Sequence, residues 1–167
     1  DSTLAQSGNI EVSSGSGVSG SGSLSLSTGN ASSGKAGDID IIAGESTDVG
    51  SHVKIRSGGS SSTTGGLITI MSGFGGNSTS SGTISMISAN AADVGDSGSV
   101  HIQSGSASSG QTGSVQLSTG SSIDGSTGGI FLEVGTSNYQ SGSAVHINAG
   151  DSVMTGSKGG AVIVEAG

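Results

Sequence analysis

The sequence contains no cysteine, no proline and no tryptophan, and Phe74, Phe131 and Tyr139 are its only aromatic residues. Without cysteine, disulfide bonds and thiolate metal sites are excluded. Twelve acidic residues outnumber four basic ones, and the net charge of −8 argues against a nucleic-acid partner. No stretch approaches the roughly 18 apolar residues that a membrane helix needs. We therefore expect a protein with no catalytic activity, no cofactor, no nucleic-acid partner and no membrane span.

Glycine, serine and threonine together occupy 87 of the 167 positions, a composition typical of flexible linkers. The apolar residues nevertheless follow a period of 14 to 17 residues, which a linker does not need. Each repeat holds one triplet, two apolar residues separated by a single residue. The eleven triplets are Ile10/Val12, Leu24/Leu26, Ile39/Ile41, Val53/Ile55, Ile68/Ile70, Ile84/Met86, Val100/Ile102, Val115/Leu117, Ile130/Leu132, Val145/Ile147 and Val162/Val164.

A glycine stands three residues after the second apolar residue of ten triplets, and Ala89 takes its place in the other. We call this position the corner. The residue before the corner, the pre-corner residue, is small in almost every repeat, and another glycine follows the corner by about five residues. Two-residue alternation in an extended chain places both triplet side chains on one face and the residue between them on the other. The pattern indicates short extended segments separated by glycine-rich turns.

The sequence thus predicts an all-β, single-domain β-solenoid over residues 1–167, with about eleven coils of about 15 residues. Each triplet would lie over the next at about 4.8 Å. A coil of two repeats, with triplets on both faces, is the alternative. Neither end resembles a capping repeat, so we expect a segment of a longer repeat protein or a unit that stacks end to end.

Two units, Gly22-Ser-Leu-Ser-Leu-Ser-Thr-Gly29 and Gly113-Ser-Val-Gln-Leu-Ser-Thr-Gly120, are separated from the following repeats by serine-rich spacers. They resemble the tandem Ser/Gly-rich repeats in surface and secreted proteins of diatoms and other microalgae. The repeat length is also similar to that of the β-rolls of ryegrass-type ice-recrystallisation-inhibition proteins, although their Asn-x-Val signature is missing. The first resemblance implies an extracellular or cell-surface structural setting.

The titratable residues do not suggest an active site. In a solenoid, His101 and His146 would lie three coils apart, too far to share a metal ion. His52 would stack over Asp38 in a surface charge pair. We therefore expect no catalytic residue and no metal site.

Asn30-Ala-Ser32 and Asn77-Ser-Thr79 match the acceptor pattern for N-glycosylation. Both fall in the spacers between triplets. Asn30 and Asn77 are thus candidate glycosylation sites.

A further group of apolar residues occupies positions that alternation would turn outward. An exposed apolar patch of this kind marks an interface. We call it the association patch and expect it to mediate lateral packing. Its members are Ile42, Leu67, Met71, Phe74 and Ile87.

The sequence as a whole favours a non-enzymatic structural module of an extracellular filament, appendage, adhesive or cell coat. Such a module would stack coil on coil and self-associate end to end or laterally. The alternative is a solenoid that binds ice or polysaccharide glycans through a flat face rich in serine and glycine.

Overall fold

A computed structural model describes residues 7–92, 94–139 and 141–166 of the chain. These residues contain no helix and no strand, so the predicted all-β solenoid is wrong. The physical reason is that the triplets do not stack on one another in backbone ladders, and no described side chain is buried in a core. The chain divides into two units, Asp1–Ile84 and Ser85–Gly167.

The absence of a core is evident from the accessible surface, which amounts to 17007 Å². A globular monomer of this mass exposes about 7,200 Å², and its unfolded chain about 22,600 Å². The protein therefore keeps most of the surface of an extended chain in contact with solvent. Hydrophobic burial within the chain contributes little to its free energy.

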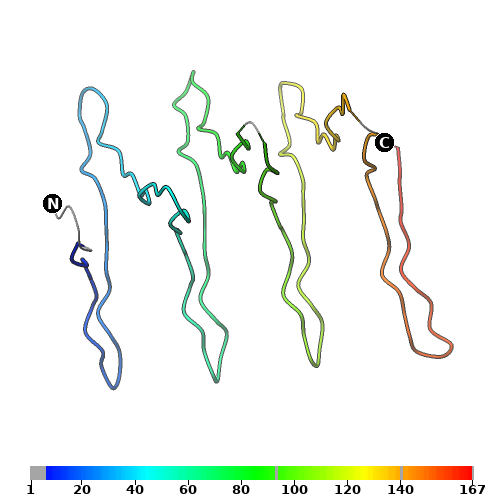
Figure 1. The fold of residues 1–167 in the computed structure, drawn as a ribbon, viewed down its shortest axis with the longest axis horizontal. Helices are drawn as coiled ribbons and strands as arrows, with labels where there is room; N and C mark the ends of the chain where they lie inside the picture. The colour runs from blue at the N-terminus through cyan, green and yellow to red at the C-terminus, as the bar shows by residue number, and fades with distance from the viewer. Residues whose placement is uncertain (1–6, 93, 140, 167) are drawn as a thin grey trace. The chain divides into compact units, whose positions relative to one another are not determined.

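Each spacer contains one bend or turn, and extended segments carry the triplets between them (Figure 1). Gly34 and Gly110 end two of these bends with φ angles of 87° and 107°, a backbone region that only glycine enters readily. Serine hydroxyls support others, since the Thr63 and Ser62 N–H groups both donate to Ser60 Oγ. In the first unit the bends span 18–19, 32–34, 47–49, 61–63 and 77–79, and in the second 94–95, 108–110, 123–125, 138–139 and 154–156.

Alternation along the extended segments is visible in the exposure of neighbouring side chains. Ile68, the first residue of its triplet, is 48% exposed, whereas Leu67 beside it is 86% exposed. Ile84 and Ile87 differ in the same way, at 48% and 84%. Most triplet side chains thus lie on the more protected face of their segment, although none of them is buried and Ile10 and Val164 are 95% and 91% exposed.

Among the described residues, no helix has the length and apolarity required to cross a membrane.

The missing core leads to a prediction about the dilute protein. At micromolar concentration we expect its far-UV circular dichroism to change gradually with urea, because the described residues form no cooperative core that could unfold. The control is the same titration at a hundredfold higher protein concentration. A sigmoidal transition in the dilute sample, with a slope of about 1–3 kcal/mol/M, would contradict the prediction.

Candidate functional site

Neighbouring repeats approach each other closely at a glycine that stands two residues before the next triplet. We call this residue the opening glycine. A Cβ atom built on Gly66 would lie 3.3 Å from the Cβ of Ser57, and one on Gly82 would lie 3.4 Å from the Cβ of Ser72. In each case the partner is the pre-corner residue of the preceding repeat.

Seven pairs of neighbouring repeats meet in this way, with distances of 3.3 to 3.7 Å from the built Cβ to the partner's Cβ. A Cβ on Gly66 would be tight against Ser57, whereas at the contacts of 3.5 to 3.7 Å a Cβ would make ordinary van der Waals contact with its partner. The first unit holds the pairs Ser14/Gly22, Thr28/Gly37, Ser57/Gly66 and Ser72/Gly82, and the second unit holds Ser88/Gly98, Ser104/Gly113 and Ala149/Gly160.

Backbone hydrogen bonds reinforce three of these contacts. The N–H of Gly66 donates to the carbonyl of Gly58 at 2.9 Å, and the N–H of Gly82 donates to the carbonyl of Gly73 at 2.9 Å. Gly160 and Gly150 form the same bond at 2.8 Å. In every case the opening glycine donates to the corner glycine before it.

The pre-corner residues are also the most protected part of the described chain. Ser57, Ser72, Ser88 and the alanines Ala43 and Ala149 are half-buried, whereas nearly all other described residues are exposed. The Ser57 hydroxyl in addition donates to the Gly66 carbonyl at 2.9 Å. The contact between pre-corner residue and opening glycine therefore holds successive repeats together.

The opening glycine also recurs in the sequence, at a fixed position that the triplets and corners alone do not define. The residue two positions before the first apolar residue is glycine in nine repeats, and Ser51 and Ser143 replace it in the other two. The rule would have been found by aligning the repeats on their triplets. Its meaning, a close approach of two chain segments, needed the tertiary structure.

The structure does not gather the titratable residues into a site. No group of three or more His, Asp or Glu residues that could hold a metal ion occurs in the described chain, and no pocket is found there. Asp38 does not pair with His52. Its carboxylate instead forms an ion pair with Lys35, whose Nζ donates a hydrogen bond to Asp38 Oδ2 at 2.7 Å. Because both side chains are largely exposed, this pair contributes little to stability.

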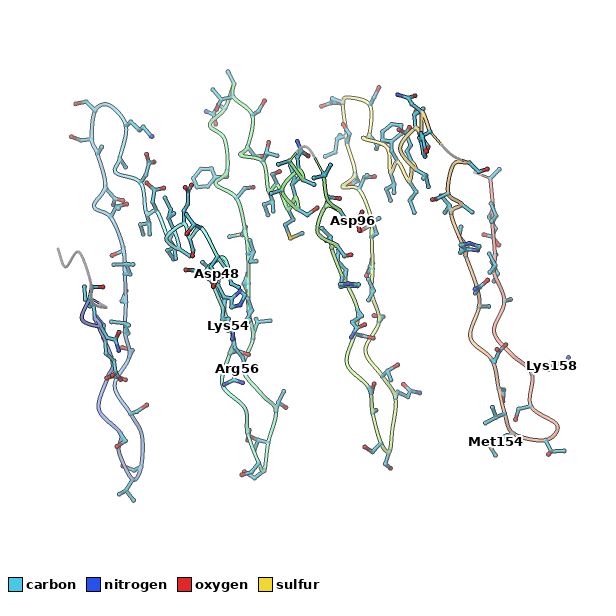
Figure 2. The ribbon with its side chains drawn as sticks, viewed as in Figure 1. Asp48, Lys54, Arg56, Asp96, Met154 and Lys158 are labelled. Carbon is cyan, nitrogen blue, oxygen red and sulfur yellow. The ribbon has the colours of Figure 1, made fainter. Side chains whose placement is uncertain are left out.

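Charged side chains project from the extended segments into solvent. Lys54 and Arg56 lie on one segment, two residues apart, and Asp48 lies in the bend before it (Figure 2). The Asp48 N–H donates to Ser46 Oγ at 3.1 Å, which fixes the backbone of that bend. All three residues are exposed, and none of them forms an ion pair within the described part of the chain.

The two candidate glycosylation sites are exposed. Asn77 lies in a turn that the Thr79 side chain closes, since the Gly76 N–H donates to Thr79 Oγ1 at 2.8 Å and the Thr79 N–H to the Gly76 carbonyl at 3.1 Å. Asn30 precedes the bend at 32–34. The use of either asparagine stays a prediction.

All members of the association patch are exposed, by 84% to 96%. Ile42, Leu67, Met71 and Phe74 belong to the first unit and Ile87 to the second. Their exposure exceeds that of most triplet residues, in agreement with outward positions. Their part in lateral packing stays a prediction.

No known protein family, no curated protein and no solved structure matches this chain.

The close approach of pre-corner residue and opening glycine can be tested by disulfide formation, because the chain has no other cysteine. Ser104→Cys with Gly113→Cys places two Cβ atoms about 3.7 Å apart, near the mean of about 3.8 Å for disulfides. Equilibration with glutathione should give this pair an effective concentration roughly ten times that of the control pair Ser104→Cys with Ser114→Cys. Alternation turns Ser114 to the other face. Equal values for the two pairs would refute the contact.

Proposed function

We propose that this protein is a non-enzymatic structural module of an extracellular filament, appendage, adhesive or cell coat, and that it acts by self-association. One observation carries the proposal: eleven apolar triplets recur along the chain, and those in its described part find no core there. Apolar surface repeated so regularly gains free energy when copies of the chain cover it.

The energetic argument favours assembly over a function of the isolated chain. Ordering one residue costs about 1–2 kcal/mol of backbone entropy. Fully burying a Val, Leu or Ile side chain stabilises a protein by about 1.5–3 kcal/mol. The isolated chain lacks this stabilisation, because none of its described apolar side chains is buried. Contacts between copies would supply the missing burial.

A role in ice or polysaccharide binding receives no support from the geometry. That alternative required a flat solenoid face of serine and glycine, and the described residues form no solenoid. The extracellular setting belongs to the proposal because serine-rich and threonine-rich exposed segments suit a hydrated coat. Asn30 and Asn77 would carry glycans only in such a setting.

Electron microscopy of the purified chain tests the proposal. At neutral pH and rising concentration we expect uniform fibres in negative stain, together with a fast-sedimenting fraction that grows with concentration. The dilute sample, which should sediment as a monomer, is the control. A chain that remains monomeric at millimolar concentration would overturn the proposed function.

Substitutions within one segment distinguish the triplet face from the association patch. Ile68→Ser with Ile70→Ser removes apolar surface worth about 1.5–3 kcal/mol per residue from the triplet face. We expect this variant to raise the concentration needed for fibres by at least about tenfold. The matched variant, Leu67→Ser with Met71→Ser, changes the opposite face and should still form fibres, but with less lateral bundling. The reverse ranking in a sedimentation assay would show that the patch drives assembly.

A further inference from the structure

Neighbouring repeats meet at the opening glycine, with one backbone hydrogen bond at three of the contacts and no continuous backbone ladder in the described chain. Directly opposite residues in a β-ladder have Cβ atoms about 4.5–5.5 Å apart. At the seven repeat contacts, the distance from a Cβ built on the opening glycine to the Cβ of the pre-corner residue is only 3.3 to 3.7 Å. The described residues also contain no strand. Two extended arms that face each other in this way, joined by a bend, form an arch. Figure 1 shows the arms of such pairs running side by side.

The register of the arches is constant along the chain. The pre-corner residue stands two positions after one triplet, and the opening glycine stands two positions before the next. Because Ser57 lies opposite Gly66, Ile55 lies opposite Ile68. Val53 in turn lies opposite Ile70. The same rule applied to Ser104 and Gly113 aligns the triplets of the second unit that flank them.

The exposed fractions of the side chains indicate that the triplet residues face the opposite arm of their arch. In the facing triplets, the first residues, Val53 and Ile68, are 55% and 48% exposed. The second residues, Ile55 and Ile70, are 73% and 68% exposed. Leu67 and Met71, on the outer side of the same arm, are 86% and 85% exposed. The inner faces are thus partly covered by the opposite arm, while the arch remains one chain thick.

The backbone of the described triplets is unpaired, although three opening glycines beside them donate hydrogen bonds to corner glycines. No triplet residue in the described chain has a backbone hydrogen bond. In an extended segment the side chains and the N–H and C=O groups project in roughly perpendicular directions. Because the side chains point along the plane of the arch, the polar groups project above and below it. Such rows of free donors and acceptors template the addition of another strand.

We propose that the rows are filled by a second copy of this chain, stacked in parallel and in register, so that each arch lies about 4.8 Å above the same arch of its neighbour. This inference rests on the proposed function and specifies how the copies pair. The stacked copy supplies both parts of what the arch lacks, hydrogen-bond partners for the backbone and apolar cover for the triplets. A polysaccharide would supply hydroxyl groups only.

In-register stacking is the arrangement that keeps the apolar faces of successive layers together. It places each triplet over the same triplet of the next copy. A shift of one residue would turn Lys54 and other outer residues onto the triplet face of the next layer. The alternation of inner and outer side chains therefore disfavours such a shift.

Stacking in register also brings like charges together, and the chain carries a net charge of −8. Because salt screens repulsion between exposed charges, raising the salt concentration from about 0.01 M to about 0.5 M should shorten the lag before fibre formation by roughly tenfold. Thioflavin T fluorescence and pelleting would measure the lag. A lag that lengthens with salt would overturn stacking of like-charged layers.

Spin labels test the register directly. We would label Ser25→Cys, between two triplet residues, and separately Thr69→Cys, the equivalent position of another arch. In fully labelled fibres each label should lie beside its own copy in the next layer, and spin exchange should collapse the three-line spectrum to a single line. Fibres made with nine parts of unlabelled chain are the control and should regain three lines. Unlabelled fibres should show a meridional reflection near 4.8 Å.

The outcomes separate this inference from the proposed function. Fibres whose undiluted labels give three lines at both positions would overturn in-register stacking and leave a structural role standing. An unlabelled chain that forms no fibres would overturn both. Collapse to a single line at both positions would establish the parallel register.

Discussion

The arrangement of this chain depends on how closely two consecutive repeats approach at the opening glycine. A serine, threonine or alanine of the preceding repeat lies within 3.7 Å of the site that a Cβ would occupy, and the approach is tightest at Gly66, at 3.3 Å. At three of these contacts the same glycine donates a backbone hydrogen bond to the corner glycine. The spacing and register of the facing arms follow from this contact, and so does the alignment of the triplets.

This constraint also explains why half of the chain consists of three small residue types. Small residues let two arms pack closely, but they bury little area, so each arch has a thin interior. A thin interior cannot offset the entropy of ordering the whole chain. The isolated protein consequently exposes more than twice the surface of a globular protein of its mass. Assembly is the physical route by which such a sequence would become stable, which is the basis of the function proposed above.

The repeat length and the alternation could be read from the sequence, and the positions of the bends agree with the spacers. The inner and outer faces follow from alternation, as the contrast between Ile68 and Leu67 shows. The solenoid prediction failed because a triplet pattern specifies which face is apolar and not which neighbour covers it. A parallel coil and a pair of facing arms require the same alternation. The pairing of His52 with Asp38 failed for the same reason, since it depended on coils lying over one another.

The sequence by itself determined the local features: the extended triplets, the glycine-rich bends, the negative charge and the absence of thiol chemistry. These depend on neighbouring residues and on composition, so no long-range contact is needed to define them. Only the tertiary structure decided that successive repeats meet at the opening glycine, because that choice depends on the approach of residues eight or more positions apart. Nothing in the sequence relates Ser57 to Gly66. In the structure, the Cβ of Ser57 lies 3.3 Å from the position that a Cβ of Gly66 would take.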